Sequence, residues 1–272
     1  MRLLVLTLLL AAAIPCLVEA QRGGRGSGAG WRGGSDFTVY NVPYDGRFTF
    51  VRLSFTPGSQ GGWGGRGRGR SGRGGDLYWD HDWPIAETNL VKLLRELTDI
   101  RPFMEGSNIL AADDPELFKY PVAYVSEPGH WMLSDAEAEG LRDYVLKGGF
   151  LIFDDFADDY GWGAYEWGTF EQGMLRVLPD ARPVRLDFSD PIFHSFFEID
   201  SLELQHPYRY VYAEFWGIYE NNDSSKRLLA IINYNADIGD YWEWSDQGWY
   251  PIPLSNEAYK LGVNYIVYAM TH

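Results

Sequence analysis

The order of hydrophobic and polar positions predicts strands and helices that alternate along the chain. Residues 48–55 (FTFVRLSF) alternate between apolar and polar positions, which is typical of a strand. Pro84 suits the first turn of a helix, and leucines recur at helical spacing up to about Thr98. Residues 121–126 (PVAYVS) form a short apolar run that enters a Glu-Pro-Gly turn at 127–129, so we expect a second strand there.

A capping box marks the start of the next helix. Ser134 is followed three positions later by Glu137, and the glycine pair at 148–149 is a typical helix stop. The sequence FLIF at 150–153 follows at once and is apolar on both faces, as a central parallel strand must be. Strand, helix and strand in this order predict a right-handed parallel unit, and therefore an α/β fold.

Polar side chains follow the carboxyl ends of these two strands. Open parallel sheets bind ligands at that edge, and the loop after the second strand adds aromatic residues and further carboxylates. Such a combination suits a carbohydrate or a cation. A structural interpretation stays open, because acidic residues at strand ends also cap helices and loop aromatics also pack. The candidate ligand residues are Glu127, His130, Asp154, Asp155, Trp162, Glu166 and Trp167.

Two further polar motifs favour structural roles. In WDHDW at 79–83, two aspartates flank His81 directly before a helix; ligands this close in sequence do not converge easily on one metal, so we expect an aspartate to cap the helix. Residues 233–237 carry Asn, Asn and Asp at alternate positions, as a calcium loop does. Ile238 and Trp244 replace the glycine and glutamate that such a loop needs, so we expect an Asx turn leading into an aromatic strand.

The N-terminal segment has the features of a signal peptide. Arg2, an apolar run over 3–14 and small residues before Gln21 predict cleavage after residue 20 and export to the periplasm or the medium. An uncleaved membrane anchor is the alternative, and nothing later in the chain reads as a membrane span. The single cysteine, Cys16, lies in this segment, so the mature chain has no thiol for disulfides, catalysis or metal binding.

Charge is distributed unevenly along the chain. The formal net charge is −15, which argues against nucleic acid as a partner, yet residues 21–46 and 57–75 are rich in glycine and arginine. Both segments contain too little apolar surface to order themselves, and the second interrupts a domain expected over 47–272. A solvated linker is the favoured interpretation, and contact with anionic envelope polymers is the alternative. The candidate polyanion contacts are Arg66, Arg68, Arg70 and Arg73.

Several motifs in order resemble one bacterial family. The run LSDAEAEGLRDYVLKGGFLIFDDF, with YPVAYVSEPG before it and EWGTFEQGMLRVLP after it, resembles the family catalogued as domain of unknown function 4159. The similarity continues through DPIFHSFFEI, NYNADIGDYWEW and the terminal LGVNYIVYAMTH, and covers about residues 47–272. The resemblance implies a three-layer flavodoxin-like fold, as in class I glutamine amidotransferases, with helices on both faces of a parallel sheet. It implies a setting in envelope assembly but no established activity.

The catalytic motifs that the sequence lacks exclude several classes of activity. Amidotransferases of this architecture use a cysteine nucleophile, so that activity is excluded here. The family often has a histidine where this chain has Asp190, although His194 is nearby. Serine-hydrolase, zincin and P-loop motifs do not occur, and no motif predicts a cofactor. The first hypothesis is a non-catalytic binding or assembly module of the cell envelope, with envelope proteins or polymers as partners. A carbohydrate-acting or carbohydrate-binding protein and a divalent cation-binding domain are the alternatives.

Overall fold

The computed structural model describes residues 41–57, 77–158 and 165–272. All of these described residues belong to one compact unit. The expected signal peptide, the four arginines proposed to contact polyanions, and Trp162 lie outside the described residues. Within the described residues, no helix is both long and apolar enough to cross a membrane.

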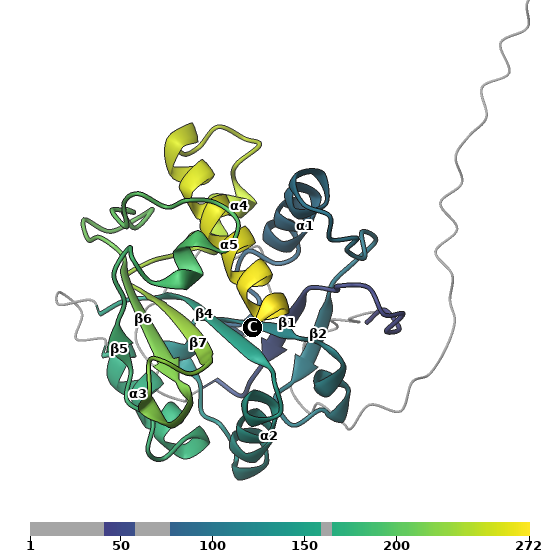
Figure 1. Ribbon diagram of the computed structural model, residues 1–272, viewed down its shortest axis with the longest axis vertical. Helices are drawn as coiled ribbons and strands as arrows, with labels where there is room; N and C mark the ends of the chain where they lie inside the picture. Colours follow the sequence, from purple (N-terminus) through teal and green to yellow (C-terminus); the bar gives the residue numbers. More distant parts are fainter. Residues whose placement is uncertain (1–40, 58–76, 159–164) are drawn as a thin grey trace, which may run out of the picture. The chain divides into compact units, whose positions relative to one another are not determined.

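The fold is α/β, and a mixed β-sheet forms the centre of the described part (Figure 1). Seven strands of the described residues lie in the order β2-β1-β3-β4-β7-β6-β5; the first five in this order run parallel, and β6 and β5 are antiparallel to their neighbours. The strands are β1 (Val51–Ser54), β2 (Asn108–Ala111), β3 (Val122–Ser126), β4 (Phe150–Phe156), β5 (Val184–Arg185), β6 (Glu214–Tyr219) and β7 (Leu228–Tyr234).

The antiparallel edge departs from the expected parallel sheet. Strands β6 and β7 are separated by only the residues 220–227, which include the short 3-10 helix η4 (Glu220–Asn222). A parallel crossover needs a dozen or more residues, so a connection this short allows only antiparallel pairing. The parallel expectation therefore holds for the larger part of the sheet and is wrong at this edge.

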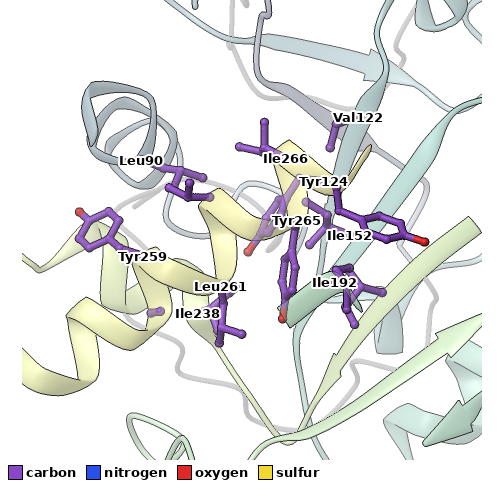
Figure 2. Packing of buried hydrophobic residues seen from close by; sticks show 14 of the residues in the cluster. Leu90, Val122, Tyr124, Ile152, Ile192, Ile238, Tyr259, Leu261, Tyr265 and Ile266 are labelled. Carbon is purple, nitrogen blue, oxygen red and sulfur yellow. The ribbon is translucent and has the colours of Figure 1, made fainter. Parts of the chain in front are cut away.

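Helices cover both faces of the sheet. Helices α1 (Ile85–Leu97), α4 (Ile238–Glu243) and α5 (Ile252–Thr271) pack on one face, whereas α2 (Asp135–Leu146) and α3 (Glu166–Val177) pack on the other. Because side chains alternate along a strand, each strand contributes to both layers. On the first face, Figure 2 shows Tyr124 of β3 and Ile152 of β4 beside Tyr265 of α5.

The predicted strand-helix-strand unit is present as β3, α2 and β4. Its two strands pair in parallel from Val122 with Phe150 to Ser126 with Asp154. The capping box is complete: the Ser134 hydroxyl accepts the Glu137 amide, and the Glu137 carboxylate accepts the Ser134 amide. Strand β4 is longer than expected, since it continues to Phe156 through a register shift after Phe153. Asp154 and Asp155 are thus part of the strand rather than of the loop after it.

Arg52, fully buried in β1, anchors the segment that precedes α1. Its Nε donates to Glu87 Oε1 at 2.7 Å, and its Nη1 donates to the carbonyl oxygens of Trp79 at 3.1 Å and His81 at 2.8 Å. The guanidinium also lies over the ring of Tyr124, 4.8 Å from its centroid. The charge of one strand residue therefore holds the turn before α1 against the sheet.

Replacing Arg52 alone should be far more damaging than replacing the whole ion pair. Arg52→Met leaves the carboxylate of Glu87 buried without a counter-charge, so we expect a loss of about 3–5 kcal/mol in the free energy of unfolding. Arg52→Met combined with Glu87→Met should recover most of that loss. Urea denaturation of the two variants and the wild type measures both effects, and an equal loss in single and double variants would contradict the assignment.

Candidate functional site

Three neighbouring parallel strands end in acidic residues at one edge of the sheet. Glu127 follows β3 directly, Asp155 is the penultimate residue of β4, and Asp237 lies three positions after β7. Because β3, β4 and β7 are adjacent and parallel, their carboxyl ends lie side by side. In open α/β sheets this edge is where ligands bind.

The segment before α1 brings a histidine and another aspartate to the same edge. His81 Nδ1 lies 2.6 Å from Glu127 Oε1 and 3.5 Å from Asp155 Oδ2. Asp82 follows it. No side chain caps α1, which begins after Pro84, so the expected aspartate cap is absent. The two residues instead face the strand ends because Arg52 holds the turn that carries them.

These residues form one continuous cluster, which we call the edge cluster. Within the described residues, three sets of side chains place ligand atoms within 4.8 Å of one another. Asp155 belongs to the first and second sets, and Asp82 belongs to the second and third. The sets are His81, Glu127 and Asp155; Asp82, Asp155 and Asp237; and Asp82, Asp240 and Glu243.

The second set contains a carboxylate oxygen that has no donor. Asp82 Oδ2 is shielded from solvent and has no hydrogen-bond partner. Asp237, only 4% exposed, accepts the amide of Asp240 through Oδ1 at 2.9 Å, and Asp155 Oδ2 accepts the Ser126 hydroxyl at 3.3 Å. Among the described residues, no lysine or arginine forms an ion pair with these three carboxylates. Arg52 and His81 oppose the raised pKa of Asp82 only in part, so the second set would be stabilised by a further positive charge.

Burial and mutual proximity raise the pKa values of the three aspartates in the second set. Burial, together with the charge of Glu127, raises the pKa of Asp155 to about 7, although His81 opposes the shift. Burial and the charge of Asp155 raise the pKa of Asp82 and that of Asp237 well above the ordinary value for aspartate. Three carboxylates so close together resist full ionisation in the absence of a cation.

The first set differs because histidines already neutralise Glu127. Burial opposes its ionisation, yet hydrogen bonds to His130 and His81 hold the pKa of Glu127 below its usual value. His130 Nε2 lies 3.1 Å from Glu127 Oε2 and 3.6 Å from Glu166 Oε1, and its ring stacks on Tyr78 at 4.0 Å. Although burial lowers it, these two carboxylates raise the pKa of His130 to about 9, so His130 is protonated at neutral pH.

Several non-glycine residues at this edge of the sheet have strained, left-handed backbone conformations. Asp82, Glu127 and Asp155 adopt left-handed φ values of 63°, 49° and 59°. Tyr78 and Asn235, in the adjoining segments, do the same, so five of the seven described non-glycine residues with positive φ lie here. Such conformations cost about 1–3 kcal/mol each and are frequent at binding sites, where the surrounding structure holds side chains in place.

Close packing holds α4 against the cluster. The fully buried Asp154 accepts the hydroxyl of Tyr124 and the amides of Ile238 and Gly239 through Oδ2, at 2.7–3.0 Å. A Cβ atom at Gly239 would lie 2.4 Å from Asp82 Oδ2, so only glycine permits this approach. Asp154 thus binds the N-terminus of α4 beneath the edge cluster, whereas Asp155 lies within it.

The other expected ligand residues have structural partners. Trp167 packs among the rings of Phe156, Trp216 and Tyr234, with centroid distances of 4.8–6.3 Å. Glu166, the first residue of α3, accepts the Ala157 amide through Oε2 at 2.7 Å. Glu127 and Asp155 lie in the cluster, and His130 and Glu166 adjoin it.

Sequence reasoning did not select Asp82 or Asp237 as ligand residues. For Asp237 the signal was present, because the apolar run of β7 ends just before it, as that of β4 does at Asp154. The aromatic strand expected after Asp237 is wrong: residues 238–243 form α4, and the Asp237 side chain caps it. For Asp82 the WDHDW motif at 79–83 was a local signal, but its spacing favoured helix capping, since the position of Asp82 depends on contacts with a distant strand.

The comparisons with known proteins identify a family but no activity. A family described as a domain of unknown function (DUF4159) matches residues 70–270, and the chain belongs to it. No curated protein matches the chain.

The stability of the cation-free protein should fall as pH rises through about 7. The pKa of Asp155 is raised in the folded state, so its contribution is complete below the unfolded pKa and is lost as pH rises through the folded value. Asp155→Asn should therefore reduce the loss between pH 5 and pH 8. Urea unfolding in chelator at four pH values measures it, with the exposed Asp200→Asn as control. A steeper loss in Asp155→Asn would contradict the prediction.

Proposed function

We propose that this protein binds a divalent cation at the edge cluster, through Asp82, Asp155 and Asp237. The observation that carries the proposal is the carboxylate of Asp82: its Oδ2 atom is shielded from solvent and lacks any donor, and the residue offers a ligand atom within 4.8 Å of those of two other carboxylates. A buried carboxylate oxygen without a partner is strongly unfavourable. A cation at this point would satisfy that oxygen and remove the repulsion within the set.

The donor set determines which cations fit. Three carboxylates suit hard cations that prefer oxygen ligands, such as Ca²⁺, Mg²⁺ and Mn²⁺. His81 lies next to the set and could add an imidazole nitrogen, which favours Mn²⁺ or Zn²⁺ over Ca²⁺ and Mg²⁺. The protonated His130 lies on the other side of Glu127 and disfavours a cation there.

The three ligands come from different parts of the chain. Asp155 belongs to β4, Asp237 caps α4, and Asp82 precedes α1. A cation bound between them would join two helices to the central sheet. Binding at such a point stabilises the folded state by mass action, because the unfolded chain has no preformed site.

We extend the proposal to fold and location. The parallel β3-α2-β4 unit and the helices on both faces support a flavodoxin-like arrangement similar to class I glutamine amidotransferases, without their cysteine nucleophile. The residues 1–20 support export to the periplasm or the medium. In that setting a cation-binding module could serve envelope assembly.

Thermal unfolding of the chelator-treated chain with Ca²⁺, Mg²⁺, Mn²⁺ or Zn²⁺ tests the proposal. A cation at 100 times its dissociation constant should stabilise the fold by about 2.7 kcal/mol, which raises the Tm by a few degrees. Asp82→Asn and Asp237→Asn should remove the increase, whereas the exposed Asp200→Asn should keep it.

Titration calorimetry on the same variants provides the stoichiometry. Binding should fall at least about tenfold in Asp82→Asn, which corresponds to the loss of one charged ligand. The proposal fails if none of the four cations raises the Tm, or if the two substitutions in the cluster leave binding unchanged.

A further inference from the structure

An exposed aromatic pair lies beside the edge cluster. The rings of Trp244 and Trp249 stack with centroids 4.4 Å apart and an interplanar angle of 14°. Trp249 is 64% exposed, so the face of its ring that points away from Trp244 is open to solvent. A single exposed ring is common on protein surfaces, whereas exposed rings that gather in one place mark candidate binding sites.

Hydrogen bonds fix this pair against the edge cluster. Trp244 Nε1 donates to Asp240 Oδ1 at 3.0 Å, and the Tyr250 hydroxyl donates to Asp240 Oδ2 at 2.9 Å. Both oxygens of Asp240 are therefore engaged. Asp240 in turn has a ligand atom within 4.8 Å of one of Asp82. The aromatic pair therefore adjoins the edge cluster through Asp240.

A second segment contributes another exposed ring to the same region. Tyr208 is 64% exposed and packs against Tyr250 with centroids 6.4 Å apart. The segment that carries it is held to α4, because the Tyr241 hydroxyl donates to the carbonyl oxygen of Gln205 at 2.8 Å. We call Tyr208, Trp244, Trp249 and Tyr250 the aromatic platform.

We infer that the aromatic platform binds a neutral oligosaccharide, with a sugar ring stacked on Trp249 and its hydroxyl groups directed to the edge cluster and the cation bound there. The part of this inference that concerns the cation rests on the proposed function. The aromatic platform itself was not anticipated from the sequence, which pointed to the segment containing Trp162 and Trp167 instead.

The chemistry of the surface selects this ligand class. The C–H face of a sugar ring packs on an indole face, while its hydroxyls donate to carboxylates or coordinate a hard cation through oxygen. Anionic polymers would meet like charge, since the chain has a formal net charge of −15 and the cluster is acidic.

Calorimetry of the full chain with four neutral hexasaccharides, those of cellulose, amylose, chitin and mannan, tests the inference. Each is titrated with a saturating cation and again in chelator. We expect one of them to bind, and Trp249→Ala to weaken it by about tenfold or more because a stacked ring is lost. Phe188→Ala, which removes an exposed ring elsewhere, should leave binding unchanged.

The outcomes separate the inference from the proposed function. Cation binding should be the same in Trp249→Ala and the wild type, whereas Asp82→Asn should lose the cation. A wild-type chain that binds the cation but none of the four hexasaccharides at about 5 mM would overturn the inference alone. Self-association that disappears in Trp249→Ala would also overturn it, since the platform would then contact a second copy of the chain.

Discussion

The buried guanidinium of Arg52 is the interaction on which the rest of the site depends. It lies in β1, pairs with Glu87 of α1 and binds the carbonyl oxygens of Trp79 and His81. A buried charged group is unfavourable without several partners, and those partners are what bring α1 and its preceding turn to the sheet. Without them, Asp82 would have no fixed position opposite the strand ends.

Electrostatic repulsion among three carboxylates is the second interaction that characterises this edge of the sheet. Asp82, Asp155 and Asp237 lie together although burial and mutual charge disfavour their ionised forms. The left-handed backbone at two of these residues adds to the unfavourable terms. The apolar core on both faces of the sheet balances these terms, and a cation would convert the same geometry from unfavourable to favourable. That contrast is the physical basis of the proposed binding function.

Local signals predicted the elements that depend on neighbouring residues. The capping box at Ser134, the apolar run of β4 and the parallel unit that they imply are all present. The predictions were wrong where contacts between residues far apart in the sequence determine the secondary structure or the strand direction. The aromatic stretch after Asp237 is apolar enough for a strand, yet Asp154 binds the amides at 238 and 239 and favours the start of a helix. The short connection between β6 and β7 likewise set their direction against the expected parallel sheet.

The sequence by itself determined the alternation of strands and helices, the absence of a thiol after residue 20 and the presence of acidic residues at the ends of β3 and β4. These features follow from the composition of the chain and from the spacing of neighbouring residues. Only the tertiary structure decided that Asp155 faces the cluster while Asp154 lies beneath α4, and that Asp82 and Asp237 join from other segments. The reason is that strand order and the contacts of Arg52 bring together residues far apart in the chain, which no local pattern encodes.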